Sequence, residues 1–295
     1  MRVRPPWAMR MRSPPQRGRT ETGACARRAA LAPTPRLEVA ASQAGFGRAL
    51  ALSGAEILVG EPFNETTTSM VYVYCKVAGK WAESGAVHAA DGKNSDGFGF
   101  AIATHANLML VSANRADENK GAAYIFSRNA QGAWTQVARL SANDGAPAEN
   151  YGTFVALGSD VALVAAPGQN KQTGAVYVYR RNGNEWTQDT KLVSPDAKEQ
   201  GFFGQGVAVI GDRLLIGEPG HNERTGVVHV YTRGAEGWTA ASKLSPNGLQ
   251  KADRFGAPIH VDGSPLLLSP VGFGGAGAAL AGVVVKSSGP SAAQF

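Results

Sequence analysis

The sequence contains very little cysteine, few charged residues and no long apolar segment. Of its 295 residues, 2 are cysteines, Cys25 and Cys75, and 18% are Asp, Glu, Lys or Arg. Two cysteines cannot form the disulfide framework that stabilises many small secreted domains. No apolar run approaches the length of about 20 residues that crosses a bilayer, so we predict that the chain is not membrane-spanning.

The positive charge of the chain is confined to its beginning. The formal net charge is +6, but residues 1–36 alone contain nine arginines and one acidic residue, Glu21. The remaining residues carry 20 basic and 22 acidic side chains. A nucleic-acid-binding surface needs clustered lysine and arginine on the folded part of the chain, and the remainder lacks such clusters. We therefore exclude nucleic acid as the main partner.

Residues 1–36 are rich in arginine and proline and poor in apolar side chains. Such a composition buries too little apolar surface to offset the loss of chain entropy, which predicts a disordered tail. The segment also lacks the continuous apolar stretch of a secretory signal peptide. Its composition leaves three interpretations open: a disordered basic tail, an arginine-rich organellar presequence, or residues upstream of the true start.

Glycine is abundant, at 37 residues, and the sequence repeats with a period of about 52 residues. Each unit opens with an aromatic residue followed by glycine, and the first four units also contain a second ring 26 positions later and then a tryptophan. The opening aromatics are Phe46, Phe98, Tyr151, Phe203 and Phe255. The second rings are Tyr72, Tyr124, Tyr177 and His229, and the tryptophans are Trp81, Trp134, Trp186 and Trp238.

Each unit has the pattern of four short antiparallel strands. The first strand is predicted to begin at the aromatic-glycine pair, as in residues 203–210, and a proline such as Pro219 ends the second strand. The third strand is rich in valine and tyrosine, and the fourth contains the tryptophan. Because the third strands are apolar on both faces, both faces of every sheet must be covered.

These patterns predict an all-β fold, a β-propeller whose four-stranded antiparallel blades each pack between two neighbours. We expect five blades over residues 37–295, with units that start near residues 46, 98, 151, 203 and 255. The last unit ends without a tryptophan strand, and residues 36–39 are predicted to supply the missing strand and close the ring. The repeated tryptophans are expected to pack between blades.

Two short motifs carry a family resemblance. The aromatic-glycine pairs, with Tyr151-Gly152 as a variant, are followed at fixed distance by a second motif. That motif reads Gly60-Glu61-Pro62, Ala165-Ala166-Pro167 and Gly217-Glu218-Pro219, and Ser112-Ala113-Asn114 departs from it. The units resemble FG-GAP repeats, the blade unit of the integrin α-chain propeller, over about residues 37–285. The resemblance implies a role in adhesion or recognition, a secreted or cell-surface location, and calcium sites in the loops.

The loops that would hold calcium in such repeats are residues 64–69, 115–120, 168–173 and 220–225. A calcium loop needs several oxygen ligands at alternating positions, and none of the four loops has that spacing. Asp117-Glu118-Asn119 comes nearest, but Lys120 follows it directly. We therefore predict no metal site and no cofactor from the residues, while the resemblance leaves Ca²⁺ open.

Acidic residues precede the aromatic-glycine pairs and are our candidates for ligand binding at one rim of the ring. They are Asp91, Asp96, Asp144, Glu149, Asp196, Glu199 and Asp253. The alternative interpretation is structural, because Asp, Asn and Gly form turns and cap backbone groups.

The sequence contains no nucleophile elbow and no phosphate-binding loop. We therefore predict a monomeric, non-catalytic module that binds a protein or glycan partner through its rim loops. The alternative is a propeller hydrolase that acts on a polysaccharide. Such an enzyme would gather two or three carboxylates in the axial channel, at least one with a shifted pKa.

Overall fold

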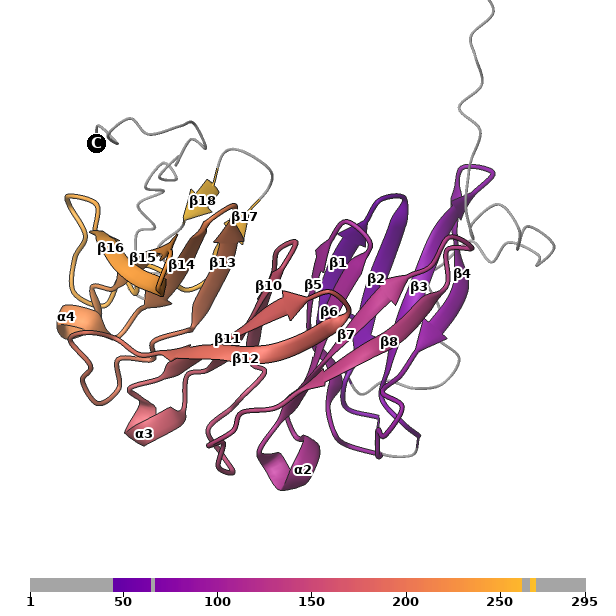
Figure 1. Cartoon of the computed structure of the whole chain (residues 1–295), viewed down its shortest axis with the longest axis horizontal. Helices are drawn as coiled ribbons and strands as arrows, with labels where there is room; N and C mark the ends of the chain where they lie inside the picture. Colours follow the sequence, from indigo (N-terminus) through magenta and orange to yellow (C-terminus); the bar gives the residue numbers. More distant parts are fainter. Residues whose placement is uncertain (1–44, 65–66, 262–265, 269–295) are drawn as a thin grey trace, which may run out of the picture.

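The computed structural model describes residues 45–64, 67–261 and 266–268 (Figure 1). The described residues form four antiparallel sheets of four strands, each with its strands in chain order, and a fifth sheet of two strands. The helices in this part of the chain are three turns of four residues, α2 (Ala116–Asn119), α3 (Gln169–Gln172) and α4 (His221–Arg224). The chain is therefore all-β, as the repeat predicts.

Each four-stranded sheet corresponds to one sequence unit, and we call the sheets blades 1 to 4. Blade 1 consists of β1 (Leu50–Ser53), β2 (Glu56–Glu61), β3 (Met70–Val77) and β4 (Lys80–Val87). Blade 2 consists of β5 (Phe98–His105), β6 (Leu108–Ala113), β7 (Ala122–Arg128) and β8 (Trp134–Leu140). Blade 3 consists of β9 (Phe154–Leu157), β10 (Val161–Ala166), β11 (Ala175–Asn182) and β12 (Glu185–Leu192). Blade 4 consists of β13 (Gly206–Ile210), β14 (Arg213–Glu218), β15 (Val227–Gly234) and β16 (Gly237–Leu244), and the last sheet of β17 (Ile259–Val261) and β18 (Leu266–Leu268).

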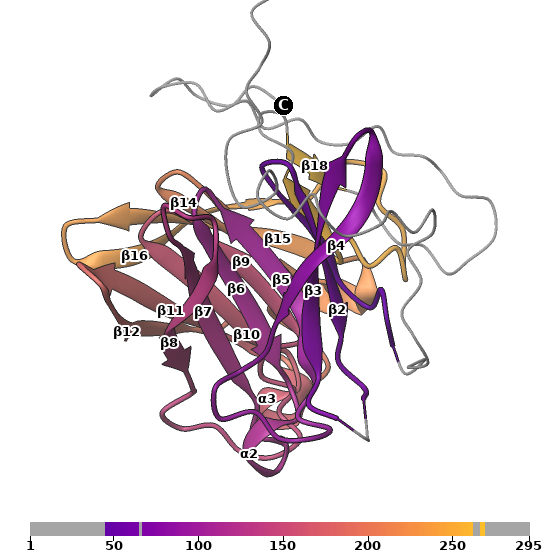
Figure 2. The same ribbon diagram turned by 90° about the vertical axis from the view of Figure 1, so that its right-hand side faces the viewer.

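The blades follow one another in chain order with their faces together (Figure 1 and Figure 2). The first strand of every sheet contacts the first strand of the next, from β1 through β5, β9 and β13 to β17. Residues of all five strands line an open cavity of about 410 Å³, among them Leu50, Val155 and Val207. Inner strands that line an axis, with the other strands outside them, are the arrangement of propeller blades. The predicted propeller architecture is confirmed.

The predicted closure of the ring falls on residues outside the described ones. Strands β17 and β18 are the described part of the fifth unit, and Phe255 is buried against blade 4. Residues 1–36, the strand expected at 36–39 and the last predicted strand at 283–285 also lie outside the described residues. No helix in the described part of the chain is long and apolar enough to cross a membrane.

The third strands explain why both faces of a blade must be covered. In β11, Val176 and Val178 belong to the core shared with blade 4. Tyr177 and Tyr179, which point to the other face, belong to the core shared with blade 2. Alternate side chains of one strand therefore join two neighbouring blades, and burial of this apolar surface is the main force that stacks the sheets.

The opening aromatic and the ring 26 positions later are one packing unit. The two rings meet edge to face in four successive blades, with centroid distances of 5.3–5.7 Å. Phe98, Tyr151 and Phe203 are at most 1% exposed. Edge-to-face pairs contribute about 0.5–1.5 kcal/mol beyond the burial of their area. This contact explains why the opening aromatic and the second ring recur together in the repeat.

The aromatic-glycine pair does not begin the first strand in most blades, which corrects our expectation. Strand β13 begins at Gly206 rather than at Phe203. Gly204 has a φ of +96°, and the backbone turns there before the strand starts. The turn brings one blade close to the next: a Cβ added at Gly217 would lie 1.8 Å from the carbonyl oxygen of Gly256. Within one blade the two motifs are joined directly, because the backbone N–H of Gly204 donates to the carbonyl oxygen of Gly217 at 2.9 Å, and this hydrogen bond accounts for their fixed spacing.

The tryptophans of blades 2, 3 and 4 pack towards the preceding blade. Trp186 is 9% exposed and belongs to the core that joins blades 2 and 3. Trp134 and Trp238 are half-buried against the cores shared with blades 1 and 3. Trp81 is also half-buried. These rings lie in the framework rather than on an open platform for stacking sugars.

Candidate functional site

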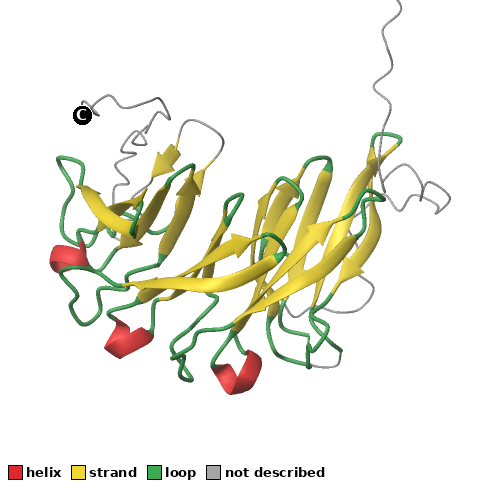
Figure 3. Cartoon of the chain, viewed as in Figure 1, coloured by secondary structure: helices red, strands yellow, loops and turns green. Residues whose placement is uncertain are grey.

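The turns α2, α3 and α4 lie along the same edge of the molecule, between the second and third strands of their blades (Figure 3). Each contains three successive residues with positive φ, for example Asn170, Lys171 and Gln172 at 47°, 55° and 69°. This left-handed conformation costs roughly 1–2 kcal/mol per residue without glycine, so other contacts must hold it.

Hydrogen bonds to the next blade hold these left-handed turns. The carbonyl oxygen of Gln172 accepts from the backbone N–H of Phe202 at 2.8 Å. In the following blade the carbonyl oxygen of Arg224 accepts from the N–H of Arg254, also at 2.8 Å. The turns thus join each blade to the loop that leads into the next one.

Three of the loops proposed by resemblance for calcium are fully described, residues 115–120, 168–173 and 220–225, and they do not fit a calcium ion. Backbone carbonyls of the left-handed turns are used between blades, and the Asp117 carboxylate is paired with Arg139. Within residues 45–64, 67–261 and 266–268, no three Asp, Glu, His or Cys side chains gather as a metal-binding group. We derive no role for a metal from these loops.

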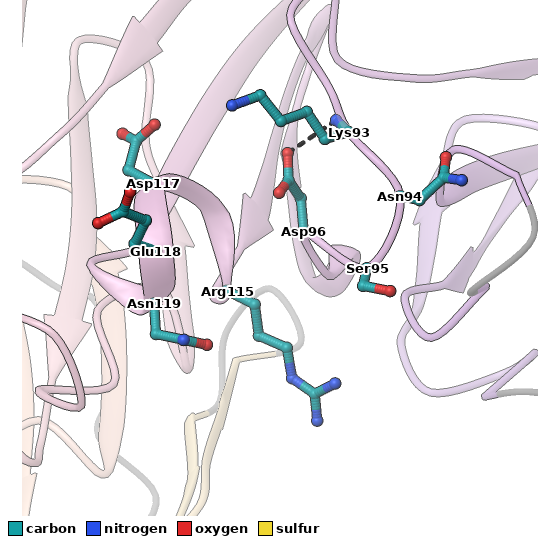
Figure 4. Close-up of a pocket in the computed structure, with 8 residues that line it drawn as sticks. All are labelled: Lys93, Asn94, Ser95, Asp96, Arg115, Asp117, Glu118 and Asn119. Atoms are coloured by element: carbon teal, nitrogen blue, oxygen red, sulfur yellow. Dashed lines mark hydrogen bonds between the residues drawn. The ribbon is translucent and has the colours of Figure 1, made fainter.

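An open cleft of about 620 Å³ lies on this edge, in blade 2 (Figure 4). One wall is the loop before β5, which contributes Lys93, Asn94, Ser95 and Asp96, and the other is the α2 turn. Residues 115 and 117–119 line that second wall. The carboxylate of Asp96 accepts from the backbone N–H of Lys93 at 2.8 Å, which shapes the first wall. The cleft therefore presents amide, hydroxyl and charged groups to solvent.

Three of the predicted ligand-binding acids form ion pairs with the last strand of the following blade. Asp91 pairs with Arg139, Asp144 with Lys191 and Asp196 with Lys243. In each case the acid follows the last strand of one blade and the base lies in the last strand of the next. The hydrogen bond from Lys191 lowers the pKa of Asp144, and the one from Lys243 lowers the pKa of Asp196.

The other predicted acids are also engaged locally. The carboxylates of Asp96, Glu149 and Asp253 each accept from the backbone N–H three residues earlier, at 2.6–2.9 Å. Glu199 pairs with Lys171 at 2.8 Å, and both side chains are exposed. Of the seven predicted residues, Asp96 alone lines the cleft in the described structure. Whether any of them binds a ligand stays a prediction.

A buried polar cluster in blade 4 was not predicted from the repeat. Glu218 is 1% exposed, and its Oε2 lies 2.8 Å from Ser194 Oγ and 2.7 Å from His229 Nε2. His221 Nδ1 lies 3.6 Å from the same oxygen. Glu218 occupies the place of Ala113 and Ala166 in blades 2 and 3, and this departure was the available signal.

The cavity lined by the first strands of the blades bears on the hydrolase alternative, which expects carboxylates there. The described residues that line it are apolar apart from Thr104 and include no aspartate or glutamate. The carboxylate group expected of a propeller glycosidase is therefore not found among the described residues that line this cavity. Absence of catalysis stays a prediction.

A family model described as the FG-GAP repeat matches three consecutive segments, residues 81–126, 134–179 and 186–231. Each segment begins in the fourth strand of one blade and ends in the third strand of the next. Each match therefore spans a blade boundary and includes the aromatic-glycine pair that forms it. None of the curated proteins matches the chain.

Proposed function

Because the chain is an FG-GAP repeat protein, we propose that it is a non-catalytic recognition module that binds a protein or glycan partner through its rim loops. FG-GAP propellers are often binding domains, and an adhesive role at the cell surface or outside the cell is part of this proposal. The observation that carries it is the open cleft between residues 93–96 and 115–119 on the edge where α2, α3 and α4 lie.

Each blade combines a fixed framework with exposed loop side chains, and this arrangement supports the proposed function. Strands and left-handed turns are fixed by packing and by hydrogen bonds between blades, so they form a rigid support. The side chains of Lys93 and Glu118 on the cleft walls are exposed and have no ion-pair partner among the described residues. Loops on a rigid scaffold can present such groups to a partner without loss of stability.

An array experiment tests the proposal. The full chain is applied to glycan and protein arrays in calcium and in EDTA, and each ligand is measured again with the variant Lys93→Ala/Glu118→Ala. The matched control is Lys80→Ala/Glu236→Ala, which removes the same charges in exposed hairpins between the third and fourth strands. We expect the cleft variant to lose about tenfold or more in affinity, equal to about 1.4 kcal/mol, in both buffers.

The control variant is expected to bind as the natural chain does. Equal binding by all three proteins would reject the cleft as the recognition surface. Turnover of an array glycan into shorter products would instead favour the hydrolase alternative.

A further inference from the structure

Five arginines in the described part of the chain lie over aromatic rings. The pairs are Arg48 with Phe100, Arg115 with Phe63, Arg128 with Trp134, Arg139 with Tyr124 and Arg233 with Trp238. A ring under the guanidinium group restrains its orientation and leaves the N–H edges available for hydrogen bonds.

Three of these arginines also hold a carboxylate from the protein. Arg128 pairs with Glu56 at 2.6 Å, Arg139 with Asp91 at 2.9 Å and Arg233 with Asp160 at 2.6 Å. The fold thus uses one arrangement three times, with an aromatic ring against the guanidinium and an oxyanion at its edge. The planar fork of N–H donors matches a carboxylate in this way.

Arg48 and Arg115 have the ring but no carboxylate. Their guanidinium carbons lie 4.2 Å and 4.7 Å from the ring centroids of Phe100 and Phe63. Neither side chain makes an ion pair with a described residue, and both are exposed. Compared with the other three arginines, each lacks the oxyanion that completes the arrangement.

These two incomplete pairs form one patch. The rings of Phe63 and Phe100 meet edge to face at a centroid distance of 6.0 Å, so Arg48, Phe100, Phe63 and Arg115 form a continuous group, the Arg–Phe row. Arg115 also lines the cleft, and its side chain extends away from Asp117 and Glu118 (Figure 4). The row therefore continues from the cleft of blade 2 to blade 1.

The row is a departure from the repeat rather than part of it. Two residues after the opening aromatic, blades 1 and 2 carry Arg48 and Phe100, whereas blades 3 and 4 carry Thr153 and Gln205. Seventeen residues after the aromatic, Phe63 and Arg115 are replaced in blades 3 and 4 by glycine, at Gly168 and Gly220. Packing of the propeller does not require these four side chains, which leaves them available for binding.

The surroundings of the row restrict the class of ligand. Beside Arg115 the cleft contains Asn94, Ser95 and Asn119, whose amides and hydroxyl can bond to hydroxyl groups. It also contains Asp96 and Glu118, which would repel a densely charged polyanion. A ligand with many hydroxyls and separate carboxylates satisfies both conditions.

We infer that the Arg–Phe row binds the carboxylates of an acidic glycan of the uronic-acid type. Arg48 and Arg115 each bind one carboxylate through the N–H edge, and the polar cleft wall binds neighbouring hydroxyls. This inference rests on the proposed recognition function and names the ligand class for the same edge of the molecule.

Isothermal titration of the full chain tests the inference with three probes. The probes are a linear uronic-acid hexasaccharide, its carboxyl-reduced neutral counterpart and a hexaglutamate peptide. The variants are Arg48→Ala/Arg115→Ala, the same positions changed to lysine, and the control Arg180→Ala/Arg213→Ala, which removes two exposed arginines outside the row. Thermal melting of each variant confirms that it is folded.

We expect the natural chain and the control to bind the acidic hexasaccharide alike. The alanine variant should lose about tenfold in affinity per arginine, and the lysine variant should recover only part of it because lysine lacks the planar fork. Carboxyl reduction should weaken binding to the natural chain by a similar factor and have little effect on the alanine variant.

Besides a failure to bind any probe, two outcomes would overturn the inference and leave the proposed function intact. In one, the acidic hexasaccharide binds but the arginine variants bind equally well. In the other, hexaglutamate binds as tightly as the hexasaccharide, which would assign the row to an acidic peptide. If the chain binds none of the three probes while an array ligand is lost in Lys93→Ala/Glu118→Ala, the recognition function stands and the glycan class is wrong.

Discussion

Blades 1 and 4 carry a glutamate at the same place in the repeat, but the two carboxylates have different surroundings. Glu61 and Glu218 are 0% and 1% exposed. Glu61 Oε2 accepts from the hydroxyl of Tyr72 at 2.8 Å, and its Oε1 has no hydrogen-bond partner in the described structure. Glu218 Oε2 lies within hydrogen-bond distance of both Ser194 and His229. The same backbone position thus holds a carboxylate with one partner in blade 1 and with two in blade 4.

The difference shows how a repeat can change one blade without changing its fold. Blades 2 and 3 carry Ala113 and Ala166 at this position, so a glutamate is not needed to form the strand. In blade 4 the carboxylate connects two blades, because Ser194 follows the last strand of blade 3. Removal of a buried carboxylate that bonds to several groups lowers the free energy of unfolding strongly, because each group loses its partner. Removal of a carboxylate with one partner lowers it less.

The largest expected effect comes from removal of the two carboxylates. Glu218→Ala leaves Ser194 and His229 without their partner inside the protein, and we expect a loss of about 3–5 kcal/mol in the free energy of unfolding. Glu61→Ala should cost about 1–3 kcal/mol, because only the Tyr72 hydroxyl loses its partner. Urea unfolding followed by fluorescence measures both. Equal losses would mean that the additional contacts of Glu218 add nothing to stability.

The sequence repeat predicted the framework well because the same side-chain packing recurs between successive blades. Packing requires the same residue types at the same places in each unit. It therefore accounts for the aromatic pairs, for third strands that are apolar on both faces, and for strands that end at Pro167 and Pro219. The left-handed turns were not predictable in this way. Residues 170–172 contain no glycine, and contacts with the next blade impose their positive φ.

The candidate site was harder to predict because its residues do not repeat. Acids that recur from blade to blade, such as Asp91 and Asp144, are the ones engaged in recurrent ion pairs. The side chains available to a ligand occur where one unit departs from the residue type that the other units carry, as at Arg115. In a repeat protein, periodic residues mark the framework, and departures from the period are better candidates for function.

The faces of blades 1 and 4 offer a second comparison, with a smaller expected effect. Val207 and Leu50 both follow the opening aromatic by four residues, but Val207 is 7% exposed and Leu50 is 66% exposed. Val207 packs in the core shared with blade 3. Val207→Ala should therefore destabilise the chain by about 1–2 kcal/mol, and Leu50→Ala by no more than about 0.5 kcal/mol.

Urea unfolding of the two alanine variants sharpens this comparison, with Val137→Ala as a control because Val137, in the fourth strand of blade 2, is 44% exposed. A loss for Leu50→Ala as large as that for Val207→Ala would show that the free face of blade 1 is covered in solution. That result would support closure of the ring.

The smallest expected effect is a dependence of stability on pH that blade 1 does not share. Burial lowers the pKa of His221 below its ordinary value of about 6.5, because the charged imidazole is poorly solvated beside the cluster. Between the folded and unfolded pKa values the unfolded chain binds more protons, so the free energy of unfolding falls as the pH falls below about 6.5. In blade 1 the corresponding residue is Asn64, which does not titrate, and His221→Asn should remove this part of the pH dependence. Urea unfolding of both proteins from pH 7.5 to pH 5 measures the difference, and we expect the natural chain to lose more stability than His221→Asn over this range. Parallel curves for the two proteins would show that His221 is responsible for none of the loss. Paired carboxylates such as Asp144, whose pKa is lowered, lose their contribution only as the pH falls further, below about 4, which separates the two effects.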